Sequence, residues 1–202
     1  MRNINLEVVA PIDMQGFLKE NEQIGGFMVA EPIGSQSVNA GIASAKFLSN
    51  ELWSDHPCCV VAMRDDFTEK FSDATYEFID LLIKAGTFVS EHPQASANIA
   101  VHFLDPDGKL GLKSSVINKV LTDPLGIKTN NLFPVLQDFE NIQQYMHQNM
   151  GVGTTIDLNQ FIDTRYAQAA CPNMEPTPGK LHAHVTLINE IMCRNGQGVA
   201  AE

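Results

Sequence analysis

Apolar residues near the start of the chain predict a strand, a helix and a second strand. Residues 6–10 form a short strand-like run. Met14, Phe17 and Leu18 then recur at the i, i+3 and i+4 spacing of a helical stripe. Residues 27–30 carry no charge, which is typical of a parallel strand that helices cover on both faces.

Two carboxylates are notable in this unit, one before its helix and one after its second strand. Asp13 can cap the predicted helix, because its oxygens accept N–H bonds of the first turn. Glu31 and Pro32 follow the second strand, and in open α/β sheets ligands bind beyond the carboxyl ends of strands. The alternative is that Glu31 is a solvated loop residue and Pro32 only ends the strand.

Two longer helices are predicted on either side of Pro93. Ser72 is the expected N-cap of the first, and proline is tolerated in the first turn of the second. An apolar stripe predicts the core-facing side of each helix. The first stripe comprises Phe78, Ile79, Leu82, Ala85, Phe88 and Val89, and the second comprises Ile99, Ala100, Phe103 and Leu104.

Shorter helices follow. Residues 105–108 predict a turn rather than a calcium loop, because the later acidic ligands are missing. Helices are also predicted over residues 116–121 and 139–150. Asp157 indicates a capped final helix, and Asp163 with Arg165 can form a local ion pair.

Four cysteines, at positions 58, 59, 171 and 193, show neither a C-x-x-C pair nor zinc-site spacing. Cys58 and Cys59 begin a predicted strand over residues 58–63, in which free cysteine acts as a small hydrophobe. Adjacent cysteines alternate faces in a strand, so we expect this pair to be poorly placed to bridge.

The last segment has a different character. Residues 171–179 are rich in proline and predict a linker, and residues 181–192 predict a short terminal helix. His182, His184 and Cys193 could in principle hold a metal. Because i, i+2 histidines point to different sides of a helix, no metal site is expected there.

Several motifs, taken in order, resemble a known family. They are Pro11-x-x-Met14 with Leu18, Gly26-Phe27-x-Val29-x-Glu31-Pro32, Trp53-x-x-His56-Pro57-Cys58-Cys59-Val60-Val61, Ala85-Gly86-x-Phe88-Val89-x-Glu91-His92-Pro93, and Ile156-Asp157-Leu158-x-x-Phe161-Ile162-Asp163-Thr164-Arg165. Between roughly residues 5 and 170 the chain resembles the C-terminal part of substrate-binding proteins of ABC importers for nitrate, bicarbonate, sulfonates and thiamine precursors.

The resemblance implies an α/β chain that is part of a two-lobed type II periplasmic-binding-protein fold with a helix-rich C-terminal portion. Residues 1–26 would be the last βα piece of the second lobe, and residues 27–170 the crossover strand and helical remainder of the first lobe. Residues 171–202 would be the linker and terminal helix. Because residues 1–5 lead into no apolar core of signal length, we expect a fragment of a longer precursor rather than a truncated product.

The same resemblance implies a ligand site. Its candidate residues are Pro11 and Met14 from the second lobe, Glu31 and Pro32 at the crossover, and Ser35 and Gln36 after it. A carboxylate at the mouth repels a bare anion. Glu31 therefore suits a solute that carries an amine or another hydrogen-bond donor, or an anion that binds together with a cation.

Composition excludes some classes of function. The chain has 44% hydrophobic and 18% charged residues, which is ordinary for a globular protein. A net charge of −11 makes nucleic acid an unlikely partner, and no apolar run is long enough to cross a bilayer. The expected partners are a small solute and ABC permease subunits in the membrane. No cofactor is expected.

Three functions are consistent with these features. The first is periplasmic solute binding for import, and the second is a cytosolic ligand-sensing regulator of the same fold. The third, a thiamine-pathway enzyme, would require a reactive cysteine cluster and a cofactor lysine that the sequence does not show. No catalytic motif is visible, so we expect a binding protein and not an enzyme.

Overall fold

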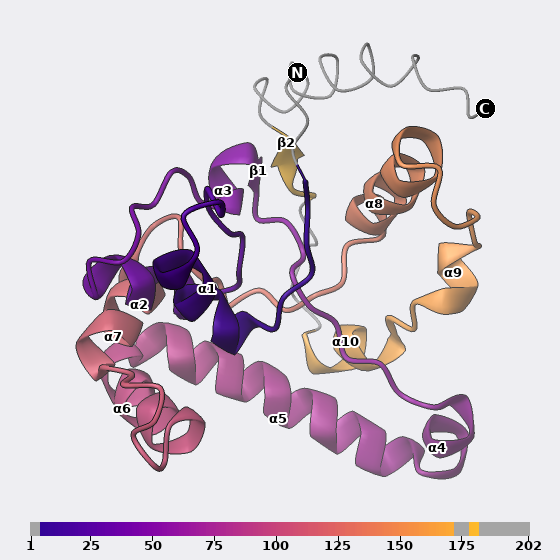
Figure 1. Cartoon of the computed structure of the whole chain (residues 1–202). Helices are drawn as coiled ribbons and strands as arrows, with labels where there is room; N and C mark the ends of the chain where they lie inside the picture. Colours follow the sequence, from indigo (N-terminus) through magenta and orange to yellow (C-terminus); the bar gives the residue numbers. More distant parts are fainter. Residues whose placement is uncertain (1–4, 172–177, 182–202) are drawn as a thin grey trace, which may run out of the picture. The chain divides into compact units, whose positions relative to one another are not determined.

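The computed structural model describes residues 5–171 and 178–181, and most of its regular structure is helical (Figure 1). Its helices in the described residues are η1 (Pro11–Asp13), α1 (Met14–Glu20), α2 (Ile33–Asn39), α3 (Ser49–Leu52), α4 (Asp65–Lys70), α5 (Ser72–Glu91), α6 (Pro93–Leu104), α7 (Ser114–Thr122), α8 (Leu136–Asn149), α9 (Leu158–Phe161) and α10 (Arg165–Ala170). Its strands are β1 (Trp53–Ser54) and β2 (Lys180–Leu181).

The described residues fall into two compact units, which are treated separately. Unit 1 comprises residues 5–48 and 88–128 and contains α1, α2, α6 and α7. Unit 2 comprises residues 49–87, 129–171 and 178–181 and contains both strands. Helix α5 is continuous and contributes residues to both units. The lobe boundaries predicted at residues 26 and 170 stay predictions.

Helices α6 and α7 form the core of unit 1. Ala97 of α6 has no exposed surface, and Val116, Ile117 and Val120 of α7 are buried. The i, i+1 and i+4 spacing places these three side chains on one face of the helix, whose existence the sequence predicted. Burial of each such side chain contributes roughly 1.5–3 kcal/mol before entropy is subtracted.

The turn predicted between these helices is confirmed. The buried carboxylate of Asp105 accepts the backbone N–H groups of Leu110, at 2.9 Å, and of Leu112, at 3.0 Å. Gly108 has a φ of +67°, a backbone conformation that residues with a side chain rarely adopt. These hydrogen bonds lower the pKa of Asp105, that of Leu110 first, because they favour the charged carboxylate.

Helix α5 occupies the predicted range, but a different face is buried. Its buried residues are Thr75 and Gly86, and Thr129 Oγ1 donates a 2.8 Å hydrogen bond to the Gly86 carbonyl. A Cβ on Gly86 would lie 2.3 Å from the Thr129 carbonyl oxygen and 2.7 Å from Leu132 Cδ1. Segment 129–132 therefore approaches α5 closely because residue 86 has no side chain.

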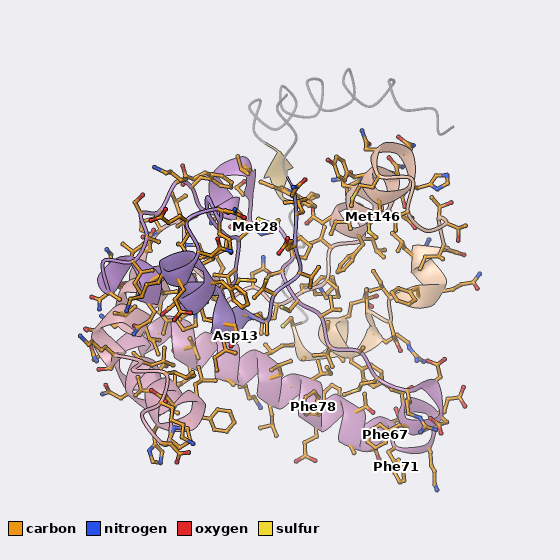
Figure 2. All side chains as sticks on the ribbon, in the orientation of Figure 1. Asp13, Met28, Phe67, Phe71, Phe78 and Met146 are labelled. Atoms are coloured by element: carbon orange, nitrogen blue, oxygen red, sulfur yellow. The ribbon has the colours of Figure 1, made fainter. Side chains whose placement is uncertain are left out.

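The two core-facing stripes predicted from the sequence are wrong in this structure. Phe78, Leu82 and Phe88 are exposed on α5, where Ala85 is exposed and Ile79 and Val89 are half-buried. On α6, Phe103 is 81% exposed, and Ile99 and Leu104 are exposed as well, while Ala100 is half-buried. Figure 2 labels Phe78 on α5. Close packing against both helices takes place at small residues instead, and no segment of the described residues buries the large ones.

The predicted strands are also wrong. Residues 6–10, 27–30 and 58–63 belong to no strand, and Leu6 and Met28 are 92% and 84% exposed. Figure 2 labels Met28. A strand needs a partner for its backbone N–H and C=O groups, and no strand of the described residues pairs with these segments. The strands that do form, β1 and β2, pair antiparallel, with Trp53 opposite Leu181. A helix-rich fold with few strands is compatible with part of a periplasmic binding protein.

The later helices agree with the sequence more closely. Helix α8 covers the predicted range 139–150 to within one residue at its end, and Asp157 caps α9 by accepting the Asn159 N–H. Leu181, where a terminal helix was expected to begin, lies in β2. The rest of that helix, most of the proline-rich linker, and His182, His184 and Cys193 lie outside the described residues.

Candidate functional site

The predicted ligand residues after residue 30 gather at the start of α2. Glu31 lies two residues before the first residue of this helix, and its Oε2 accepts the backbone N–H of Ser35 at 3.0 Å. Its Oε1 accepts the Ser35 hydroxyl, also at 3.0 Å. The structure therefore joins Glu31 and Ser35 directly, because a carboxylate here satisfies an N–H that has no partner within the helix. Glu31 is half-buried and not the solvated loop residue of the alternative interpretation.

Pro32 directly precedes the first residue of α2, and Gln36 is the fourth residue of this helix. Pro32 is half-buried at the N-cap position of α2. Gln36 Nε2 donates a 2.8 Å hydrogen bond to the Gly111 carbonyl, which ties α2 to the segment before α7. Gln36 Oε1 is buried and has no hydrogen-bond partner among the described residues. A buried acceptor without a donor is costly, which sets this oxygen apart from the other polar atoms of the segment.

Pro11 and Met14 lie in the helices η1 and α1, which precede α2 in the chain. Pro11 begins η1 and is exposed, and Met14 begins α1 and is half-buried. Asp13 stands at the predicted N-cap position, but its carboxylate makes no capping hydrogen bond. Gln15 Nε2 donates to the Ile33 carbonyl at 3.3 Å, so α1 contacts the residue directly after Pro32.

A buried aspartate in unit 2 was missed by the sequence analysis. Asp138 is 2% exposed, and its two oxygens accept the Gly179 N–H at 3.0 and 3.2 Å. A Cβ on Gly179 would lie 2.5 Å from Trp53 Nε1, an atom that is buried without a hydrogen-bond partner in the described part of the chain. The partners are 41 residues apart, and no local pattern links them.

The cysteine pair also differs from the prediction. Cys58 and Cys59 lie outside any strand, both are exposed, and their Sγ atoms are 3.7 Å apart. The strand on which the prediction for this pair rested is therefore wrong, while the prediction that the two cysteines are poorly placed to form a disulfide bridge stays a prediction. The hydrogen bond with Cys59 and partial burial both raise the pKa of Cys58.

Two other features of the described residues bear on the α2 site, which comprises Glu31, Pro32, Ser35 and Gln36. Within residues 5–171 and 178–181, no three His, Cys, Asp or Glu side chains are grouped to hold a metal. A shallow polar hollow between α8 and α9 contains Glu140 and Asp157. Their carboxylates already accept hydrogen bonds, from Gln143 and Gln144 and from Asn159 and Gln160 respectively.

Comparison with known proteins places the chain in a family. The model of the NMT1-like family matches residues 1–104, so the chain belongs to this family. This is a family of nitrate- and sulfonate-type solute-binding proteins. The match includes all six candidate ligand residues and ends at Leu104, so the resemblance noted for residues 105–170 stays a prediction.

One curated relative is a nitrate/nitrite binding protein, NrtA, from Nostoc sp.. It is 33% identical over 84 residues, which make up 42% of this chain and 19% of the relative. The aligned part thus spans about a fifth of the relative's length. No solved structure matches the chain. In the described residues, no helix combines the length and apolar character that crossing a membrane requires.

Proposed function

We propose that this protein is a solute-binding component of an ABC importer for a small anion or organic solute such as nitrate, bicarbonate or a sulfonate. The observation that carries the proposal is the family match over residues 1–104, which contains all six candidate ligand residues. The similarity to a nitrate/nitrite binding protein supports the same class of ligand.

The proposal includes a larger clamp. The match covers only 19% of the relative, which supports the idea that this chain supplies one part of a two-lobed protein. In that protein the solute is held between the lobes and delivered to permease subunits from the periplasm. The protein itself binds and releases the solute without catalysing a reaction.

The α2 site adds detail about the solute. The carboxylate oxygens of Glu31 each accept one hydrogen bond from Ser35 and can accept more, and Gln36 has a buried amide oxygen that lacks a donor among the described residues. Both groups accept hydrogen bonds, so the site favours a solute with N–H or O–H groups, or an anion that arrives with a cation. A bare anion would need positive groups from the remainder of the clamp.

Isothermal titration calorimetry on this chain and on the full reading frame tests the proposal. The solutes are nitrate, nitrite, bicarbonate with calcium, taurine, an alkanesulfonate and a pyrimidine precursor. We expect binding by the full protein, weakened at least tenfold by Gln36→Ala and by Glu31→Ala. Glu22→Ala, an exposed glutamate after α1, is the matched control and should bind as the unaltered protein does.

Three outcomes would change the proposal. A well-folded full protein that binds none of these solutes would contradict it. Binding that Glu31→Ala and Gln36→Ala leave unchanged would keep the class of protein and remove the α2 site from it. Binding without any association with permease subunits would favour the ligand-sensing regulator.

A further inference from the structure

Cys58 and Cys59 form a pair of neighbouring thiols on an exposed segment between β1 and α4. Both side chains are exposed, as are those of Val60 and Val61, and the two Sγ atoms are 3.7 Å apart. Residues 56–64 belong to no helix or strand, so no sheet ladder holds the two side chains on opposite faces. Both sulfur atoms can therefore be reached by the same small molecule.

We propose that Cys58 and Cys59 are a reversible dithiol–disulfide pair that reacts with low-molecular-weight disulfides of the glutathione class. The inference concerns a segment of unit 2 and does not rest on solute binding at α2.

The reaction takes place in two exchange steps. The thiolate of one cysteine attacks a sulfur of the small disulfide, which forms a mixed disulfide and releases one small thiolate that takes up a proton. The thiolate of the second cysteine then attacks the protein sulfur of the mixed disulfide and releases the second small thiol. The protein loses two protons and two electrons, and one small disulfide is reduced to two thiols.

The covalent geometry makes this bond reversible. Cα atoms of adjacent residues are about 3.8 Å apart across a trans peptide, below the roughly 4.4–6.8 Å that disulfides usually span. A disulfide between neighbours is therefore strained, and strained, exposed disulfides are reduced more readily than structural ones. The pair should oxidise only when the small disulfide is in excess and return to dithiol when reduced thiol is added.

Tryptic mapping of the full 202-residue chain after incubation in glutathione buffers tests the proposal. Cleavage after Lys46 and Arg64 gives a peptide of residues 47–64, whose only cysteines are Cys58 and Cys59. In excess glutathione disulfide this peptide should lose two hydrogen atoms in mass and both alkylatable thiols. Excess reduced glutathione should restore both.

Three variants sharpen the test. Cys58→Ser and Cys59→Ser should each abolish the loss of two hydrogen atoms and yield a peptide that carries one glutathione. Cys171→Ser, outside the pair, should leave the result unchanged. The proposal is overturned if the peptide stays reduced, if it carries two glutathione groups, or if the bond forms between two chains as a covalent dimer on a non-reducing gel.

Discussion

Helices α7 and α6 belong to the same unit, but they differ in whether their large apolar residues are buried. The branched side chains of α7 are buried, whereas Phe103 of α6 is 81% exposed. Helix α6 packs on α7, yet the buried residues of α6 are Ser96 and Ala97, which are small. A helical stripe of large residues thus predicts the helix itself, and the position of its packing partner decides which residues are buried.

The largest change in the free energy of unfolding is expected when one large side chain on each helix is truncated to alanine. Ile117→Ala should lower the free energy of unfolding by about 2–5 kcal/mol, because it leaves a cavity beside α6. Phe103→Ala should change it by no more than about 0.5 kcal/mol, as is usual for exposed positions. Urea titrations of both variants give the comparison. A comparable loss in both variants would show that the Phe103 face is covered in solution.

A smaller effect is expected from a methyl group at the closest approach to α5. Gly86→Ala places Cβ against the Thr129 carbonyl and Leu132 and should cost about 1–3 kcal/mol in a urea titration. Gly16→Ala in α1 is the control, since a Cβ there meets no atom within 4 Å. It should stabilise the chain by up to about 1 kcal/mol through helix propensity. Equal stabilisation by both changes would contradict the close approach of segment 129–132.

The sequence predicted helices better than it predicted contacts. Local signals, such as Pro93 in a first turn and Asp157 before α9, define helix ends because their physical effect acts within one turn. The burial of Gly86 depends on a segment more than forty residues away, and no spacing rule contains it. The predicted strands failed for the same reason, because a strand is stable only beside a partner.

In the candidate site, too, the sequence predicted which residues matter but not the contacts they make. Motif resemblance selected Glu31, Ser35 and Gln36, and the structure places all three at the start of α2. Sequence patterns could not indicate that Gln36 Oε1 is buried without a partner in the described part of the chain, because this depends on the contact with Gly111. The distance between the Cys58 and Cys59 sulfur atoms was missed because an assumed strand fixed the wrong geometry.

The loop closed by Asp105 gives a pH-dependent comparison with exposed Asp107. Hydrogen bonds from Leu110 and Leu112 lower the pKa of Asp105 in the folded state. Its stabilising contribution is therefore present above the unfolded-state pKa and is lost as pH falls through the folded-state pKa. Asp105→Asn should flatten the acid limb of stability against pH, as urea titrations across that range would show. Asp107→Asn, in the same loop, is the comparison variant, and an equal flattening by both changes would contradict a special role for Asp105.

The smallest effect should come from the confirmed ion pair of Asp163 and Arg165. Arg165 Nη2 lies 2.7 Å from Asp163 Oδ2, and its hydrogen bond lowers the pKa of Asp163, but the arginine side chain is 81% exposed. Arg165→Ala should raise the pKa of Asp163 in an NMR titration while the free energy of unfolding stays the same within error, because solvent screens exposed pairs. Asp157→Ala is the comparison, because removal of a helix cap costs about 1 kcal/mol. A loss from Arg165→Ala as large as that from Asp157→Ala would mean that the guanidinium is packed and not merely paired, and the NMR titration separates the two effects.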